Sequence, residues 1–220
     1  MNGPRFLRTA VDDTHVGSLS NRLRAKRFEE FERFVRTLPK PLQVLDVGGT
    51  VDYWQARGWA DRGDVHLTLL NLTAGESPHS NIDLVPGDAC DLSRWADGAF
   101  HVAFSNSVIE HVGAPHRQTL MAREVARVAN HYWVQTPAYS FPMEPHYLVP
   151  GWQWLPFEQR VRILQRRDVG QLGRTPDRVD AERVIEGTRL LTRRRLQAMF
   201  PGADIRPERL GLVKSWTAVR

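Results

Sequence analysis

The sequence predicts an α/β fold with a doubly wound, Rossmann-like sheet. Short and nearly continuous apolar segments alternate with helical and turn-rich segments between residues 42 and 137. Strands buried on both faces of a sheet show this unbroken apolar pattern, and helices between them imply parallel pairing with right-handed crossovers. Helices on both faces of one sheet follow from that order of elements.

The chain has 220 residues, of which 41% are hydrophobic and 25% are charged. This length and composition predict one globular domain over residues 1–220. Within it we expect an N-terminal helical cap at 1–40 and a helical insertion at 141–190.

The N-terminal helix is predicted from about Ser20 to Leu38. Phe28, Phe31 and Phe34 recur at steps of three residues among Arg, Lys and Glu, which places them on one apolar stripe. Pro39 then ends the helix.

Five buried strands follow, and their expected ranges are Leu42–Val47, Val65–Leu72, Ile82–Val85, Phe100–Ser105 and His131–Gln135. Helical segments are expected to begin at Val51 and to run from about Arg117 to Val128. A last helix, Thr192–Phe200, precedes two strands, Asp204–Arg209 and Leu212–Val219, joined at Gly211. This last pair predicts a hairpin at the edge of the sheet.

The segment from Phe141 to Gly187 differs in composition, because aromatic and proline residues crowd its first part. Arginines dominate its continuation, with eleven arginines against six acidic residues between Glu158 and Arg195, enough to account for the net charge of +5. The interleaved acids favour a solvated helical face. A basic patch that attracts nucleic acid, anionic lipid or phosphorylated substrates is the alternative.

Cys90 is the single cysteine, so no intrachain disulfide can form, and we expect a reducing cytoplasm as its location. The first seven residues lack an apolar stretch typical of a secretory signal, and no segment is long and apolar enough to predict a transmembrane helix.

A glycine turn follows the first strand, in Leu45-Asp46-Val47-Gly48-Gly49-Thr50. Glycines allow backbone amides to approach a ligand closely, although a purely structural turn is equally common. Asp46 would repel a diphosphate and suits a ligand with an ammonium group. The dinucleotide spacing Gly-x-Gly-x-x-Gly is also missing.

Two further polar positions follow the next strands in order. Asn71, beside Leu72, lies where nucleotide folds bind a ribose hydroxyl, and Asp88 with Ala89 could bind an adenine ring. Each alone could be an ordinary turn or capping residue. Three such positions in the right order favour a nucleotide-containing ligand.

Together, Asp46-Val47-Gly48-Gly49-Thr50, Gly87-Asp88-Ala89 and FHVAFSNSVIEHV (residues 100–112) resemble the motifs of class I S-adenosylmethionine-dependent methyltransferases of the broad type 11 group. The resemblance spans roughly Gln43 to Pro137, and the tail is similar to the same group. It implies a seven-stranded sheet with an antiparallel last strand and S-adenosylmethionine as cofactor. It implies that Asp46, Gly48 and Gly49 bind the methionine end, Asn71 and Leu72 the ribose, Asp88 and Ala89 the adenine, and that Asn106 lines the same crevice.

The sequence also departs from the group. Thr50 and Asp52 replace glycines that many members have, Asn71 replaces an acid, and His101 replaces an Asp at the start of the fourth strand. The first two departures affect the expected cofactor contacts.

For the transfer itself, we expect a general base at His111 or His146, oriented by Glu110 or Glu144. These residues follow the fourth and fifth strands, at the edge where such sheets bind ligands. Glu110 and His111 could instead only brace the turn.

Some similar methyltransferases carry Glu-x-x-Glu-His and a later His that bind a divalent ion. Here Ser107 replaces the first Glu, and Glu144 with His146 could complete a set suited to Zn, Mn or Fe. This is the less favoured alternative.

Trp152, Trp154 and Phe157 predict a lid over the acceptor pocket, whose aromatic faces could stack on sugars or planar rings. A peripheral contact with an anionic membrane, or plain core packing, are the alternatives.

The favoured function is O-methylation of a small molecule, such as a sugar, a polysaccharide precursor or a secondary metabolite, within a biosynthetic reaction. An RNA-directed methyltransferase is less favoured because no Asn/Asp-Pro-Pro-aromatic motif is present. A non-catalytic cofactor-binding protein is the third hypothesis. The sequence indicates neither the acceptor nor the oligomeric state.

Overall fold

The computed structural model describes residues 19–73, 75–170 and 172–220. The chain divides into two compact units, residues 1–38 and 39–220. The described part of the first unit is the helix α2 (Leu19–Val35). The first 18 residues of the expected cap lie outside the described residues, so the proposed domain division stays a prediction.

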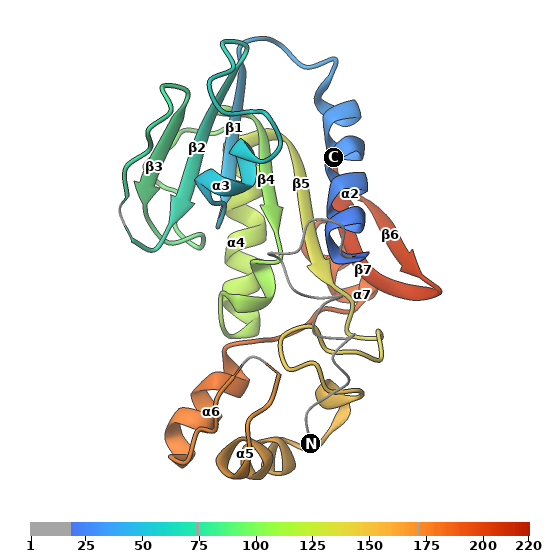
Figure 1. Cartoon of the computed structure of the whole chain (residues 1–220). Helices are drawn as coiled ribbons and strands as arrows, with labels where there is room; N and C mark the ends of the chain where they lie inside the picture. The colour runs from blue at the N-terminus through green and yellow to red at the C-terminus, as the bar shows by residue number, and fades with distance from the viewer. Residues whose placement is uncertain (1–18, 74, 171) are drawn as a thin grey trace. The chain divides into compact units, whose positions relative to one another are not determined.

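The second unit is built on one seven-stranded sheet (Figure 1). Its strands are β1 (Leu42–Val47), β2 (Val65–Asn71), β3 (Ile82–Pro86), β4 (Phe100–Asn106), β5 (Ala129–Pro137), β6 (Asp204–Leu210) and β7 (Leu212–Val219). They lie in the order β3-β2-β1-β4-β5-β7-β6. The first five are parallel, whereas β7 is antiparallel to β5 and to β6. The expected sheet with its antiparallel last strand and its edge hairpin is therefore confirmed.

The order of strands reverses at β1, which pairs with β2 on one side and β4 on the other. In such sheets the ligand crevice lies outside the carboxyl ends of the strands, where the order reverses. Asp46 lies beside Leu69 of β2 and Phe104 of β4 in the register. The glycine turn therefore begins at this point of reversal.

Helices α3 (Val51–Gln55), α4 (Pro115–Val128) and α7 (Arg193–Met199) follow the strands. Thr50 caps α3 by accepting a hydrogen bond from the Tyr53 amide at 3.3 Å. Helix α4 begins two residues before the expected Arg117 because Pro115 suits the first turn of a helix. Its apolar face, which includes Met121 and Val125, is fully buried in the main core.

Strand β5 is longer than the sequence predicted, since it continues through Thr136 and Pro137. Both residues pair with β7, which comes much later in the chain. Local signals at Pro137 favoured an earlier end, and the distant partner extends the strand.

The expected helical insertion forms a small core of its own. Tyr147, Trp152 and Val161 are buried there with residues of α5 (Phe157–Arg166) and α6 (Arg178–Glu186). The rings of Tyr147 and Trp152 stack with centroids 4.5 Å apart. Core packing therefore accounts for Trp152. Figure 1 shows α5 and α6 beyond the carboxyl ends of β4 and β5.

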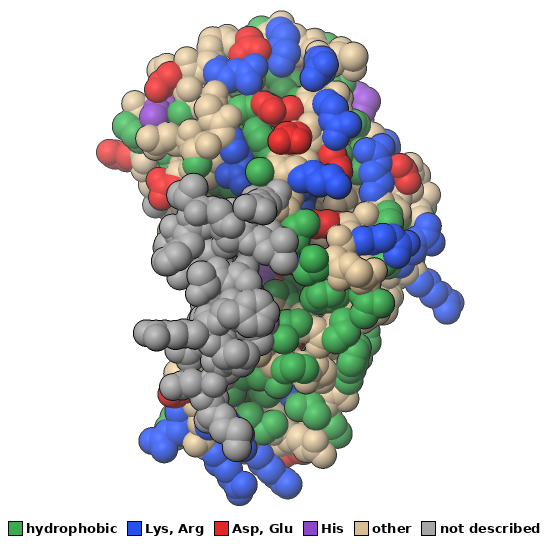
Figure 2. Space-filling view, turned by 45° about the vertical axis from the view of Figure 1, so that its right-hand side comes forward, with side chains coloured by type: hydrophobic (Ala, Val, Ile, Leu, Met, Phe, Trp, Pro, Cys, Tyr) green, Lys and Arg blue, Asp and Glu red, His purple; other side chains and the backbone are tan. Residues whose placement is uncertain are grey.

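Trp154, by contrast, is 50% exposed. Hydrophobic side chains gather on the lower part of the molecule, whereas charged side chains of both signs are interleaved on the upper part (Figure 2).

No helix among the described residues is long and apolar enough to cross a membrane.

We expect Trp152→Ala to loosen the insertion without unfolding the sheet, because the two cores are separate. Loss of a buried Trp costs about 3–5 kcal/mol of unfolding free energy. Hydrogen exchange should accelerate in α5 and α6 and stay slow in β1, β4 and β5.

The matched control is Trp154→Ala, which removes an exposed ring and should change the unfolding free energy by about 0.5 kcal/mol or less. Equal acceleration of exchange throughout the sheet in Trp152→Ala would contradict two independent cores.

Candidate active site

The glycine turn after β1 is tightly packed against its surroundings. Gly48 has a φ of +80°, and a Cβ there would lie 2.5 Å from the Val108 side chain. A Cβ at Gly49 would collide with the carboxylate of Asp46. Only glycine permits this approach, so the turn presents bare backbone at the carboxyl end of β1.

Asp46 itself is enclosed, with 1% of its surface exposed. Its Oδ2 accepts a hydrogen bond from the Trp54 indole at 2.7 Å. Burial raises the pKa of Asp46 to about 7, although the Trp54 bond acts in the opposite direction. Sequence reasoning missed this partner, because Trp54 has the pattern of an ordinary apolar residue of a short helix.

Asn71 connects the end of β2 to the glycine turn. Its side-chain amide donates to the Gly49 carbonyl at 2.8 Å, which leaves its own carbonyl oxygen to accept a hydrogen bond from a hydroxyl. Leu72 follows it and is 83% exposed. Asn71 therefore lies beside the turn, as a ribose-binding residue would.

Asp88 has two partners at the end of β3. Its Oδ1 accepts from the Cys90 amide at 2.9 Å, and its Oδ2 pairs with Arg117 at 2.6 Å. The hydrogen bond from Arg117 is the main reason that the pKa of Asp88 lies below its usual value. Ala89 is buried beside it. The capping role that we weighed for Asp88 is present, and Arg117 is a partner that the sequence did not indicate.

The four residues expected to be catalytic come together after β4 and β5. His146 Nδ1 lies 2.6 Å from Glu144 Oε1, and His146 Nε2 lies 2.9 Å from His111 Nε2. Glu144 Oε2 also accepts from the backbone amides of His146 and Tyr147, both at 2.8 Å. A buried carboxylate thus orients one imidazole, which contacts a second, exposed imidazole.

The second imidazole, His111, is held by the segment after α6. Its Nδ1 lies 3.3 Å from the Gly187 carbonyl and 3.4 Å from the Thr188 hydroxyl. Burial and the neighbouring His146 lower the pKa of His111. Burial also acts to lower the pKa of His146, but the hydrogen bond and charge of Glu144 outweigh it and raise that pKa.

Glu110 is fully buried and lies apart from this chain of hydrogen bonds. Its Oε2 accepts from the Thr136 hydroxyl at 2.9 Å, while its Oε1 has no hydrogen-bond partner among the described residues. Burial raises the pKa of Glu110 to about 7. Of the two acids expected to orient a base, Glu144 does so directly and Glu110 braces β5 through Thr136.

A divalent ion could also be held here. Glu110, His111 and His146 each offer one ligand atom, and these atoms all lie within 4.8 Å of one another. Glu144 is occupied by three hydrogen bonds, so it does not complete the two-Glu, two-His set that we considered.

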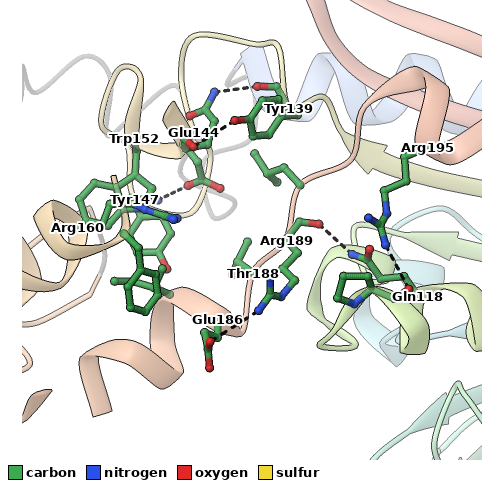
Figure 3. Close-up of a pocket in the computed structure, with 15 residues that line it drawn as sticks. Gln118, Tyr139, Glu144, Tyr147, Trp152, Arg160, Glu186, Thr188, Arg189 and Arg195 are labelled. Carbon is green, nitrogen blue, oxygen red and sulfur yellow. Dashed lines mark hydrogen bonds and ion pairs between the residues drawn. The ribbon is translucent and has the colours of Figure 1, made fainter. Parts of the chain in front are cut away.

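A cavity of about 410 Å³ adjoins this cluster (Figure 3). Glu144 and Thr188, which contact His146 and His111, both line it. Tyr139, Tyr147, Trp152 and Phe157 supply aromatic walls, so two residues of the expected lid, Trp152 and Phe157, line the cavity. Trp154 is not among the lining residues.

Residues 45–131 match the family described as methyltransferase domain. A S-adenosylmethionine-dependent methyltransferase from Methanosarcina mazei superposes with a TM-score of 0.53 at 13% identity, over 84% of this chain and 95% of the other. One from Aquifex aeolicus superposes with a TM-score of 0.50 at 11% identity, over 96% and 90%. Likenesses of such low identity show the fold alone.

A protein of Galdieria sulphuraria described as a sarcosine dimethylglycine methyltransferase aligns at 17% identity with a TM-score of 0.41. The alignment covers 55% of this chain and only 46% of that protein's chain. Among curated proteins, none matches this sequence.

The family match covers less than half of the chain, and together with the seven-stranded sheet it shows the fold of class I S-adenosylmethionine-dependent methyltransferases. The residues present fit S-adenosylmethionine as a cofactor, because the glycine turn brings backbone, the Asp46 carboxylate and the Asn71 amide together at the point of strand reversal.

We expect Gly49→Ala to weaken binding of S-adenosylhomocysteine, because the new methyl group displaces the Asp46 carboxylate. If the displaced carboxylate loses a contact with the ligand worth about 1–3 kcal/mol, affinity falls roughly 5- to 150-fold. Isothermal titration calorimetry measures the change.

Gly202→Ala is the control, because nothing lies within 4 Å of a Cβ at that glycine. Unchanged affinity in Gly49→Ala would show that the turn does not hold the cofactor.

Proposed function

We propose that the protein is an S-adenosylmethionine-dependent enzyme that methylates a hydroxyl oxygen of a small molecule, with His146 as the general base. The observation that supports this most strongly is the chain of hydrogen bonds from Glu144 through His146 to His111, at the edge of the cavity.

When bound, S-adenosylmethionine supplies a methyl group that is already activated, so the protein mainly has to position the acceptor and exclude water. A hydroxyl nucleophile additionally needs a group that accepts its proton. Glu144 accepts a hydrogen bond from the Nδ1–H of His146, which leaves the Nε2 lone pair of His146 to take the hydroxyl proton. The carboxylate then stabilises the imidazolium that forms.

His111 occupies the position from which an acceptor hydroxyl would approach. The Nε2 atom of His111 lies 2.9 Å from the Nε2 atom of His146, so a hydrogen bond with one proton joins the two rings. An acceptor hydroxyl that takes this place would donate to His146, and His111 would remain beside it.

For the cofactor, we propose that Asp46, Gly48 and Gly49 hold the methionine end and that Asn71 and Leu72 lie along the ribose. Asp88 and Ala89 would contact the adenine, and Asn106, which ends β4, would line the same crevice.

Metal-assisted deprotonation is the second candidate, and the unpartnered, buried Oε1 of Glu110 favours it. Glu110, His111 and His146 would then share an ion with mixed oxygen and nitrogen ligands. Dialysis against a chelator separates the two candidates, since turnover that is lost and then restored by a divalent ion would support the metal.

Two observations support a small acceptor over RNA. The cavity has the volume of an ordinary small-molecule site. In addition, Arg178 pairs with Glu158 at 2.8 Å and Arg183 with Asp180 at 3.2 Å, so part of the basic segment is an ion-paired helical face.

The proposal is tested by offering the enzyme S-adenosylmethionine with separate panels of hydroxyl acceptors, amines and RNA. We expect a methyl ether as the product, identified by mass spectrometry. Methylation of amines or RNA alone would overturn the proposal.

We expect His146→Gln to lower kcat by roughly 100-fold or more, the usual contribution of a general base. Affinity for S-adenosylhomocysteine should not change, because the glycine turn is intact. Glu144→Gln should show a smaller loss of kcat, since the base remains but is no longer fixed by a carboxylate.

His116→Gln is the matched control, because His116 is exposed on α4 outside the cavity. Full turnover in His146→Gln would eliminate it as the base.

We also expect affinity for S-adenosylhomocysteine to rise with pH through neutrality. The pKa of Asp46 is raised to about 7, so its carboxyl group is mostly protonated at pH 6 and mostly charged at pH 8. If only the charged form binds the ligand's ammonium group, affinity rises about tenfold over this range.

Asp46→Asn should bind S-adenosylhomocysteine more weakly at pH 8 and should lose the dependence on pH. Because the ligand titrates equally with both proteins, this variant is also the control for titration of the ligand. Equal pH profiles for the two proteins would contradict a direct charge interaction.

A further inference from the structure

The cavity beside His146 contains an excess of positive charge. Arg160, Arg189 and Arg195 line it, and the acidic residues that line it are Glu144 and Glu186. In Figure 3, Arg160 lies on the side of Tyr147 and Trp152, Arg195 lies on the opposite side near Gln118, and Arg189 comes from the segment between them.

The two carboxylates do not balance the charge of the three arginines. Glu144 is occupied by His146 and two backbone amides. Glu186 lies 3.8 Å from Arg189 only, and its side chain is 58% exposed. Within the described ranges, Arg160 and Arg195 have no carboxylate within ion-pair distance, and Arg195 donates to the Pro115 carbonyl at 3.2 Å.

These guanidinium groups are also incompletely hydrogen-bonded. The Nε atoms of Arg160, Arg189 and Arg195 are buried and have no partner among the described residues. Burial lowers the pKa of Arg160, which shows the unfavourable surroundings of its charge. A buried donor without a partner is costly, and a bound anion would satisfy it.

Elsewhere in the basic segment, ion pairs explain the arginines without any ligand, as for Arg178 with Glu158 and Glu182. That explanation does not extend to Arg160, on the cavity side of α5. Its planar guanidinium offers paired donors that match a carboxylate or a phosphate. Tyr139 and Phe157 offer aromatic side chains in the same cavity.

We propose that the methyl acceptor carries an anionic group, a carboxylate or a phosphate, that Arg160 binds with the help of Arg189 and Arg195. The rest of the acceptor packs against the aromatic walls, with its hydroxyl toward His146. The name "acceptor" rests on the proposed function, whereas the anion site is tested by binding alone.

The experiment uses the full chain saturated with S-adenosylhomocysteine and three probes of one shape, titrated calorimetrically. These are 4-hydroxybenzoate, 4-hydroxyphenyl phosphate and the neutral 4-hydroxybenzamide. We expect at least one anion to bind tenfold or more tightly than the amide. The order of the two anions then distinguishes a carboxylate site from a phosphate site.

Arg160→Gln should remove the preference for the anion, and Arg160→Lys should retain part of it. The matched control is Arg162→Gln on the same helix, whose side chain is exposed and outside the cavity lining. His146→Gln should keep the preference, so that failure of the proposed base and failure of the anion site give different results.

The inference is overturned if the three probes bind equally or if none binds. It is also overturned if Arg160→Gln keeps the preference for the anion. Unfolding of Arg160→Gln at the same denaturant concentration as the parent chain would show that the variant is intact. A short RNA could instead displace the bound anion. If that displacement requires Arg160, these arginines would be assigned to binding of nucleic acid.

Discussion

The candidate active site depends on one buried carboxylate. Glu144 accepts three hydrogen bonds within its own loop, from the ring of His146 and from the amides of His146 and Tyr147. These bonds fix the loop after β5 and the direction of the His146 ring at once. Because the same loop supplies Tyr147 to the small core of α5 and α6, the packing of the insertion and the position of the base are coupled.

The cofactor side is organised by a different constraint, namely the close approach of backbone to side chains at the end of β1. Asp46 lies beneath Gly49 and is bonded to Trp54, and Asn71 holds the Gly49 carbonyl from the neighbouring strand. The turn is thus held from both sides before any ligand binds, which is what a preorganised site requires. The enclosure of Asp46 also makes its charge sensitive to pH near neutrality.

The cavity beside Glu144 brings together groups from segments far apart in the sequence. Arg160 comes from α5, Arg189 from the segment after α6, and Glu144 from the loop after β5. Aromatic walls, unsatisfied guanidinium groups and an oriented imidazole suit an acceptor with a ring-like body, an anionic end and a hydroxyl. Each of these properties follows from burial and hydrogen bonding.

The sequence by itself determined β1, whose range Leu42–Val47 agrees with the expected one, because a buried parallel strand is an apolar run between turn residues. It also determined which residues follow β4 and β5. Only the tertiary structure decided that Glu144, and not Glu110, orients His146, that Trp54 and Arg117 occupy the carboxylates of Asp46 and Asp88, and that β7 extends β5. The physical reason is distance along the chain: local pattern encodes burial and turns, whereas hydrogen-bond partners tens of residues apart are chosen only when the sheet brings its strand ends together.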